Sequence, residues 1–135
     1  MAGRSHPFAG IVLGLLLASS TAYADAIPPD AVIVLAPGAD SIAPADSSML
    51  QQLAARAKSD AGKWISLEAY AADQGSRELN LARAQHEVEN ILQRLVSFGF
   101  PTNRIRGTSY GEEHGAAGNL PRRRVEIRIK KLGLF

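Results

Sequence analysis

Charged and apolar residues alternate along the last patterned stretch of the chain. From Arg123 to Lys131, Val125, Ile127 and Ile129 alternate with charged residues. Successive side chains of a strand point to opposite faces, so this pattern predicts a strand with one face in water. Three shorter runs predict further strands, the first because it is apolar and β-branched and the other two because they alternate loosely. They span residues 31–36, 64–71 and 104–109.

The sequence leaves open where the first predicted strand lies in the sheet and whether the last two pair with each other. Residues 31–36 form a continuous apolar run, which is typical of a strand that is buried on both faces or central in its sheet. The strands 104–109 and 123–131 are joined by a loop over 111–121, so they could pair as a hairpin. Strands joined by helices are expected to run parallel.

Apolar residues at spacings of three and four predict two helices between the strands. The first spans residues 48–58, with Asp46 or Ser47 as its N-cap. The second spans residues 77–97, with Ser76 as its N-cap and Gly99 at its end. Its predicted buried stripe consists of Leu81, Ala84, Val88, Ile91, Leu92 and Leu95. Arg83, Glu87, Asn90 and Arg94 are predicted to lie on its far side.

The order strand, helix, strand, helix, strand, strand predicts an α+β fold. In this fold two helices cover one face of a mixed four-stranded sheet, which buries both helix stripes in a two-layer sandwich. The domain is expected to span residues 31–131, after a flexible leader at 25–30 and before a tail at 132–135.

The first residues have the pattern of a secretory signal peptide, predicted to span 1–24. An uncharged apolar run from Phe8 to Ala18 precedes Ala22-Tyr23-Ala24, which has the small-x-small form of a cleavage site. A membrane anchor is the alternative, but the run has about 11 residues where a spanning helix needs about 20. The mature chain is therefore expected to be exported, without a transmembrane segment.

Composition excludes several functions. Without Arg4, the 15 basic residues of the chain fall to 14 against 13 acidic ones, so a general nucleic-acid binder is not indicated. The chain has no cysteine, which excludes disulfides, thiolate nucleophiles and cysteine metal sites. His86 and His114 lack the spacing of a metal site, and no serine has a nucleophile motif around it. We expect no enzymatic activity, no metal and no cofactor.

Arg83 is the candidate for binding chemistry. It faces away from the predicted apolar stripe, and two interpretations remain open. It could be a solvated arginine paired with Glu87 four residues on. It could also hold a carboxylate, because a guanidinium near a helix start adds a two-pronged donor to the backbone N–H groups there.

Four segments, taken in order, resemble the C-terminal OmpA-like domain. They are Leu-Asn-Leu-Ala-Arg-Ala at 79–84, Gly-Phe-Pro-Thr-Asn-Arg-Ile at 99–105, Tyr-Gly-Glu at 110–112 and Arg-Arg-Arg-Val-Glu-Ile at 122–127. The family is a periplasmic module that holds the stem peptide of peptidoglycan. The resemblance implies the same fold and a location in the periplasm, associated with the cell wall or outer membrane.

The resemblance also implies ligand-binding residues. Arg83 matches the family's arginine for the free end of diaminopimelate, and Asn80 replaces the serine beside it. Anchored on Gly75, the family's ligand aspartate falls on Ala72, and Asp73 lies one residue late.

The segment from Gly75 to Arg83 also looks about four residues shorter than the family's, close to one helical turn. Asp73 is therefore predicted either to take the aspartate's place or to leave the site degenerate. Arg123 and Arg124 match a family pair, and Arg124 with its neighbours would form a basic rim for an acidic peptide. Since side chains alternate, Arg122 and Arg124 share one face and Arg123 takes the other.

Three functions remain in competition. The first is a binding module for a diaminopimelate-containing stem peptide, with Arg83, Asp73, Gly75, Asn80 and Arg124 as ligand-binding residues. The second is a degenerate copy of the fold that acts structurally or binds another envelope protein. The third is an anionic-polymer or membrane-surface binder that uses the basic residues of 122–131, which the near-neutral charge disfavours.

Overall fold

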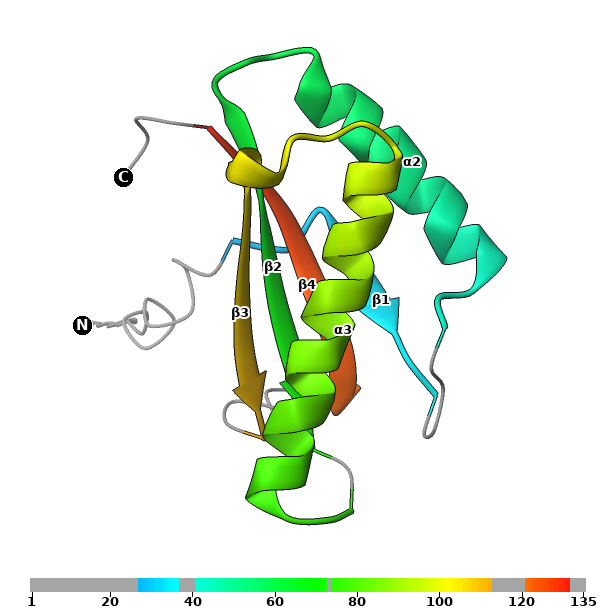
Figure 1. The fold of residues 1–135 in the computed structure, drawn as a ribbon, viewed down its shortest axis with the longest axis vertical. Helices are drawn as coiled ribbons and strands as arrows, with labels where there is room; N and C mark the ends of the chain where they lie inside the picture. The colour runs from blue at the N-terminus through cyan, green and yellow to red at the C-terminus, as the bar shows by residue number, and fades with distance from the viewer. Residues whose placement is uncertain (1–26, 37–40, 73, 113–120, 132–135) are drawn as a thin grey trace, which may run out of the picture.

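The computed structural model describes residues 27–36, 41–72, 74–112 and 121–131. Its elements follow the predicted order (Figure 1). They are β1 (Ala31–Val34), α2 (Pro44–Lys58), β2 (Lys63–Ala71), α3 (Arg77–Ser97), a short 3-10 helix (Thr102–Arg104), β3 (Ile105–Gly111) and β4 (Arg123–Lys131). The predicted α+β class with two helices and a mixed four-stranded sheet is confirmed. The predicted signal peptide at 1–24 and tail at 132–135 lie outside the described residues.

The strand order in the sheet is β1-β4-β2-β3. β2 and β3 are parallel neighbours, as expected of strands joined by a helix. β4 runs antiparallel between β1 and β2, so the hairpin of the last two strands is wrong. The expectation that residues 31–36 form a central strand is also wrong. β1 is an edge strand, and Val34 is 52% exposed because no helix covers its face.

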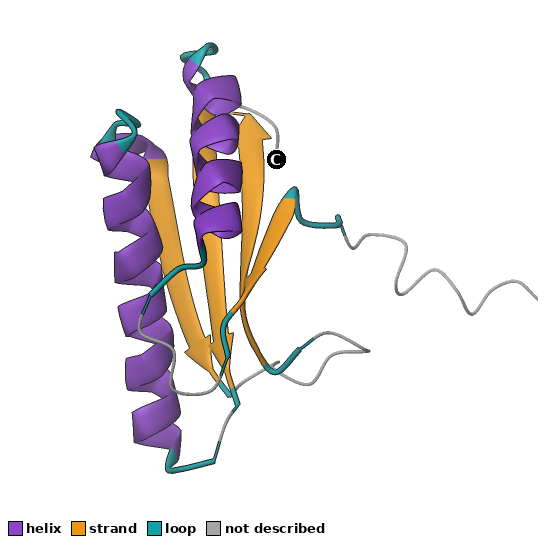
Figure 2. Ribbon diagram, turned by 90° about the vertical axis from the view of Figure 1, so that its right-hand side faces the viewer, coloured by secondary structure: helices purple, strands orange, loops and turns teal. Residues whose placement is uncertain are grey.

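The core lies between the sheet and the two helices, which cover the same face (Figure 2). Alternate residues of the two central strands point into it, with Leu67 opposite Ile127 and Ala69 opposite Val125 in the register. α2 contributes Leu50, Leu53, Ala54 and Ala57, and α3 contributes Ala84, Ile91 and Leu95. Burial of these stripes is what holds helices of this length in place.

The start of α2 was predicted too late. The helix begins at Pro44, and Ala43 is its N-cap without a side-chain hydrogen bond, so neither Asp46 nor Ser47 is the cap. Proline is favoured in the first turn because its fixed φ suits a helix and its missing N–H would have had no partner there. Pro44 therefore begins the helix ahead of the predicted start at residue 48.

α3 spans the predicted residues. Ser76 caps it through a hydrogen bond from the Leu79 amide to the Ser76 hydroxyl at 3.0 Å. Its buried face differs from the prediction, however. Leu81 is exposed, while Asn80 and Glu87 are buried. None of the described helices is long and apolar enough to cross a membrane.

The face of the sheet away from the helices is polar and aromatic. Tyr70 stacks on Tyr110 at a centroid distance of 5.1 Å, and Arg124 lies over the Tyr70 ring at 4.2 Å. Arg128 joins Glu68 and Glu126 at 2.8 and 3.0 Å. Arg128 also donates to the Ile27 carbonyl, which fixes the described end of the leader beside β4. The predicted solvated face of β4 is thus largely covered by its own ion pairs.

Candidate functional site

The candidate site lies where β2 and β3 end and α3 begins, at the lower edge of Figure 1. Chain direction explains this position, because parallel strands β2 and β3 end at the same edge of the sheet. α3 then starts from that edge after a short turn that contains Gly75. Three of the predicted ligand-binding residues, Gly75, Asn80 and Arg83, are brought together here.

Arg83 is held in a defined position. Its Nη1 donates to the Gln74 carbonyl and to Asn80 Oδ1, both at 2.9 Å. The pairing with Glu87, one of the interpretations left open by the sequence, does not occur, since Glu87 is buried beside Arg123. Among the described residues, Arg83 uses only Nη1 in hydrogen bonds, so Nε and Nη2 have no acceptor there. A planar guanidinium with two such N–H groups can donate hydrogen bonds to both oxygens of a carboxylate.

Asn80 links Arg83 to the end of β3. Its side chain is fully buried, with 0% exposure, and its Nδ2 donates to Glu112 Oε2 at 2.7 Å. Glu112 also lies 3.7 Å from Arg77 Nε. Glu112 is not among the residues predicted to bind a ligand, but the structure makes it part of this network. Its partner is 32 residues away, so no local pattern could have revealed the contact.

Gly75 permits the close approach of the loop to Arg83. Its φ of 129° lies in a region that side chains disfavour. A Cβ there would meet Leu79 Cδ2 at 2.9 Å and Arg83 Nη1 at 3.3 Å. Gly75 thus leaves room for the Arg83 guanidinium and gives the loop a backbone conformation that other residues disfavour.

The end of β3 packs equally closely on α3. Gly111 has a φ of 61°, and a Cβ on it would lie 3.2 Å from the Leu81 backbone. This contact fixes Glu112, the next residue, against Asn80. An open hollow of about 300 Å³ lies beside it, lined by Arg77, Glu78, Leu81, Ser109, Tyr110, Gly111 and Glu112.

The position of the second predicted charge is not described. Asp73 lies outside the described residues, so its role stays a prediction. Ala72, where the resemblance places the family's aspartate, is half-buried, and its amide donates to the Arg122 carbonyl at 3.2 Å. An alanine at this place offers no charge to a ligand.

Arg124 does not join the site. It points to the sheet face away from α3 and is 2% exposed. Its donors are engaged by Glu126 Oε2 and the Pro121 carbonyl, both at 2.8 Å, and by the Tyr70 ring. Its role as a ligand contact stays a prediction, and the structure gives it these partners instead.

Arg123 and Glu87 form a buried ion pair under the site. The prediction that Glu87 lies on the far side of its helix is wrong, because its side chain is 1% exposed. Arg123 Nε donates to Glu87 Oε1, and Arg123 Nη1 donates to the Ala36 carbonyl at 3.1 Å. The pair joins β4, α3 and the chain after β1. As predicted, Arg123 and Arg124 take opposite faces of the strand.

Two tyrosines have perturbed acidity. Burial raises the pKa of Tyr70 to about 12, and the carboxylates of Glu68 and Glu126 add to the rise. Burial also raises the pKa of Tyr110, with a further contribution from Glu68. Both phenols therefore stay neutral at physiological pH and act as packing groups. In the described part of the chain, no group of three or more acidic or histidine side chains could hold a metal ion.

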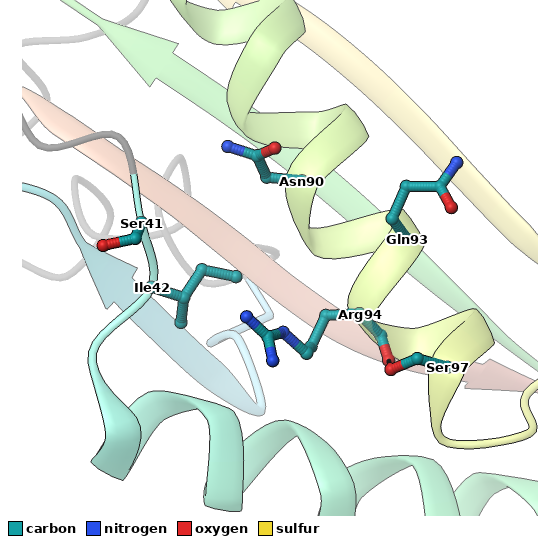
Figure 3. A pocket seen from close by; sticks show the side chains of 6 residues that line it. All are labelled: Ser41, Ile42, Asn90, Gln93, Arg94 and Ser97. Carbon is teal, nitrogen blue, oxygen red and sulfur yellow. Dashed lines mark hydrogen bonds between the residues drawn. The ribbon is translucent and has the colours of Figure 1, made fainter.

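A second hollow, of about 330 Å³, lies between α3 and the segment that leads into α2 (Figure 3). Ser41, Ile42, Asn90, Gln93, Arg94 and Ser97 line it. The sequence places Asn90 and Arg94 on the far side of the helix but assigns them no role.

Comparison with known proteins supports the resemblance to OmpA-like domains. No family model matches the chain. It is 36% identical over 80 residues to the peptidoglycan-associated lipoproteins of Brucella melitensis and Brucella suis, over 53% of this chain and 48% of each relative. The chain thus spans about half the length of the curated relatives it matches.

Solved structures share the fold. The peptidoglycan-associated lipoprotein of Burkholderia pseudomallei has a TM-score of 0.67 at 22% identity, covering 73% of this chain and 89% of that one. The OmpA-like domain of FopA1 from Francisella tularensis has a TM-score of 0.63 at 12% identity, covering 76% and 74%. The C-terminal domain of Helicobacter pylori MotB has a TM-score of 0.62 at 16% identity, covering 80% and 88%.

The chain therefore has the fold of OmpA-like domains. It is homologous to the peptidoglycan-associated lipoproteins and has the fold of the MotB periplasmic domain.

Proposed function

We propose that this protein is an exported, non-catalytic module that binds the diaminopimelate-containing stem peptide of peptidoglycan through Arg83. The observation that carries the proposal is the arrangement of Arg83. Gln74 and Asn80 fix its guanidinium beside the start of α3, with Nε and Nη2 directed to no acceptor among the described residues. The named association of its relatives with peptidoglycan supports this choice of ligand.

The chemistry of the ligand matches this arrangement. The free end of a diaminopimelate side chain carries a carboxylate and an ammonium on one carbon. The Arg83 guanidinium would donate hydrogen bonds to the carboxylate in a charge-assisted pair, favoured by the positive end of the α3 dipole. An acidic group from the loop before Gly75 would take the ammonium, and Asp73 is the residue predicted for this role. The site requires no cofactor.

Periplasmic location follows from the same proposal. The predicted signal peptide would export the chain to the compartment in which peptidoglycan lies, and the module would rest on the wall or against the outer membrane. Two charge-assisted contacts imply modest affinity, since each contributes about 1.5–3 kcal/mol.

One observation favours a second function. Ala72 stands at the family's aspartate position, so the ligand's ammonium would lack a partner there. A copy of the fold without ligand would act as a structural domain or bind another envelope protein. The two functions differ in what Arg83 does, which makes them separable by experiment.

The test is a titration of the purified protein with a diaminopimelate stem peptide, followed by NMR shift mapping. We expect saturable shifts at Gly75, Asn80 and Arg83. Arg83→Ala should weaken binding about 10- to 150-fold, the equivalent of one charge-assisted bond. Arg56→Ala is the matched control, because Arg56 is exposed on α2 away from the site.

A second peptide makes the test specific. A stem peptide with lysine in place of diaminopimelate lacks only the side-chain carboxylate. It should bind wild type and Arg83→Ala with the same low affinity. Equal affinity of wild type for both peptides would contradict the role of Arg83. Absence of shifts with either peptide at millimolar concentration would favour the protein-interaction function.

A further inference from the structure

The hollow beside the middle and end of α3 has the chemistry of a sugar site. Asn90 and Gln93 supply amides, Ser41 and Ser97 supply hydroxyls, Arg94 supplies a guanidinium and Ile42 supplies an apolar wall. No carboxylate is among the described residues that line it. Amides, hydroxyls and a guanidinium can donate to the oxygens of acetamido and hydroxyl groups, and the amides and hydroxyls can also accept.

The lining groups differ in how far they are engaged. The Gln93 amide already donates to Glu89 at 2.9 Å, and the Ser97 hydroxyl donates to the Arg94 carbonyl at 2.6 Å. The Arg94 side chain extends from α3 across the gap toward Ile42 (Figure 3). No described residue accepts a hydrogen bond from its guanidinium. Arg94 is therefore the strongest available donor in the hollow.

The α3 residues that line the hollow lie on the same side of the helix as Arg83. Arg83, Asn90, Arg94 and Ser97 are separated by seven, four and three residues, so they share one face of the helix. With a rise of about 1.5 Å per residue, Asn90 lies roughly 10 Å and Arg94 roughly 16 Å along the axis from Arg83.

We propose that this hollow is a second subsite, which binds an N-acetylated amino sugar of the polymer whose peptide lies at Arg83. This inference rests on the proposed function. The length of the ligand agrees with it, because three residues of extended peptide span roughly 10 Å. A diaminopimelate placed third from the sugar would thus lie at Arg83 when the sugar lies near Asn90 and Arg94.

The test compares three probes by NMR shift mapping on the purified protein: the free stem tripeptide, a disaccharide–tripeptide and an N-acetylglucosamine oligomer. The tripeptide should shift only Gly75, Asn80 and Arg83. The disaccharide–tripeptide should also shift Asn90, Arg94 and Ser97, and it should bind about 3- to 10-fold more tightly. The oligomer should shift the second group alone.

Variants of Arg94 test whether the higher affinity for the disaccharide–tripeptide comes from the hollow. Arg94→Ala and Arg94→Gln should reduce affinity for the disaccharide–tripeptide to that of the free tripeptide and leave tripeptide binding unchanged. Arg56→Ala is the control, since Arg56 is also an exposed arginine in the last turn of a helix and does not line the hollow. Arg94 is exposed, so the variants should keep the wild-type spectrum elsewhere.

The possible failures are distinguishable. If the disaccharide–tripeptide shifts Gly75 and Arg83 but not Asn90, Arg94 and Ser97, the subsite is wrong and the proposed function stands. The same holds if Arg94→Ala weakens both ligands equally. If no probe causes shifts at either group, both are wrong. Shifts from the oligomer alone would mean that the stem peptide does not bind at Arg83 and that the hollow is an independent sugar site.

Discussion

The Oδ1 atom of Asn80 accepts a hydrogen bond from Nη1 of Arg83 at 2.9 Å, within one turn of α3. The same buried side-chain amide donates to Glu112, just after β3, at 2.7 Å. This contact fixes the Asn80 side chain, which in turn fixes the Arg83 guanidinium. Arg83 therefore has a fixed orientation before any ligand arrives. Such preorganisation lowers the entropy that binding must overcome.

Replacing Asn80 by alanine should affect both binding and stability. The change removes the acceptor for Arg83 and a buried hydrogen bond, which should lower the free energy of unfolding by about 1–3 kcal/mol. Binding of the stem peptide should weaken roughly 2- to 10-fold, because Arg83 would have to be ordered by the ligand. Chemical denaturation and NMR titration measure the two effects. Asn103→Ala, at an exposed asparagine, should change neither. Unchanged affinity in Asn80→Ala would show that Arg83 is ordered without it.

Gly75→Ala should strain the loop and displace Arg83. The φ of 129° is unfavourable for alanine, and the new Cβ would meet Leu79 and Arg83. We expect a loss of about 1–3 kcal/mol of stability together with shifted Arg83 side-chain resonances. Gly62→Ala is the control, because its Cβ would meet only Asp60 Oδ1 at 3.4 Å. If the two variants were equally stable, the loop would have to adopt another conformation.

The buried pair of Glu87 and Arg123 should show strong coupling. Removing one partner leaves an uncompensated buried charge, so Glu87→Leu or Arg123→Met alone should cost about 3–5 kcal/mol of unfolding free energy. The double variant should cost clearly less than the sum of the two. Urea unfolding of all four proteins gives the coupling energy.

The exposed pair of Asp60 and Lys131, 4.0 Å apart, provides the comparison. Its double-mutant cycle should give about 0–1 kcal/mol. Equal coupling energies for the two cycles would contradict the importance of burial for Glu87 and Arg123.

Tyr70 should make the protein less stable at high pH. Its pKa is raised from 10.0 to about 12 in the folded protein, mainly by burial, and Glu68 and Glu126 contribute. The folded state thus binds the phenol proton more tightly than the unfolded state does. The contribution of protonated Tyr70 to the free energy of unfolding is therefore complete below pH 10 and is lost as pH rises from 10 toward 12. Unfolding measured between pH 8 and 12 should show this decline, and the decline should be smaller in Tyr70→Phe. Parallel curves for the two proteins would contradict the assignment.

Local pattern was sufficient for much of the fold. The bounds of α3 and its Ser76 cap were predicted because a helix of 21 residues repeats its apolar spacing several times. The pattern failed at Pro44, where a residue usually associated with loops starts a helix. It also failed for β1, since a continuous apolar run does not reveal whether a strand has one neighbour or two. The hairpin was wrong because its prediction rested on the loop between β3 and β4, while pairing depends on which strands fit side by side.

The candidate site was likewise predicted only in part from local sequence. Gly75, Asn80 and Arg83 lie within nine residues, and the structure brings them together as predicted. Glu112 was missed because its contact with Asn80 crosses 32 residues of sequence. Glu87 was assigned to the exposed side because helical spacing alone cannot show that Arg123 neutralises it.

The sequence by itself determined the order of helices and strands, the α+β class and the place of Arg83 at the start of a long helix. These features follow from periodicity and capping, which act over a few residues. Only the tertiary structure decided the order β1-β4-β2-β3, the burial of the Glu87–Arg123 pair and the separation of Arg124 from Arg83 by the sheet. The reason is physical: a charged side chain is buried or exposed according to partners that folding brings from elsewhere in the chain.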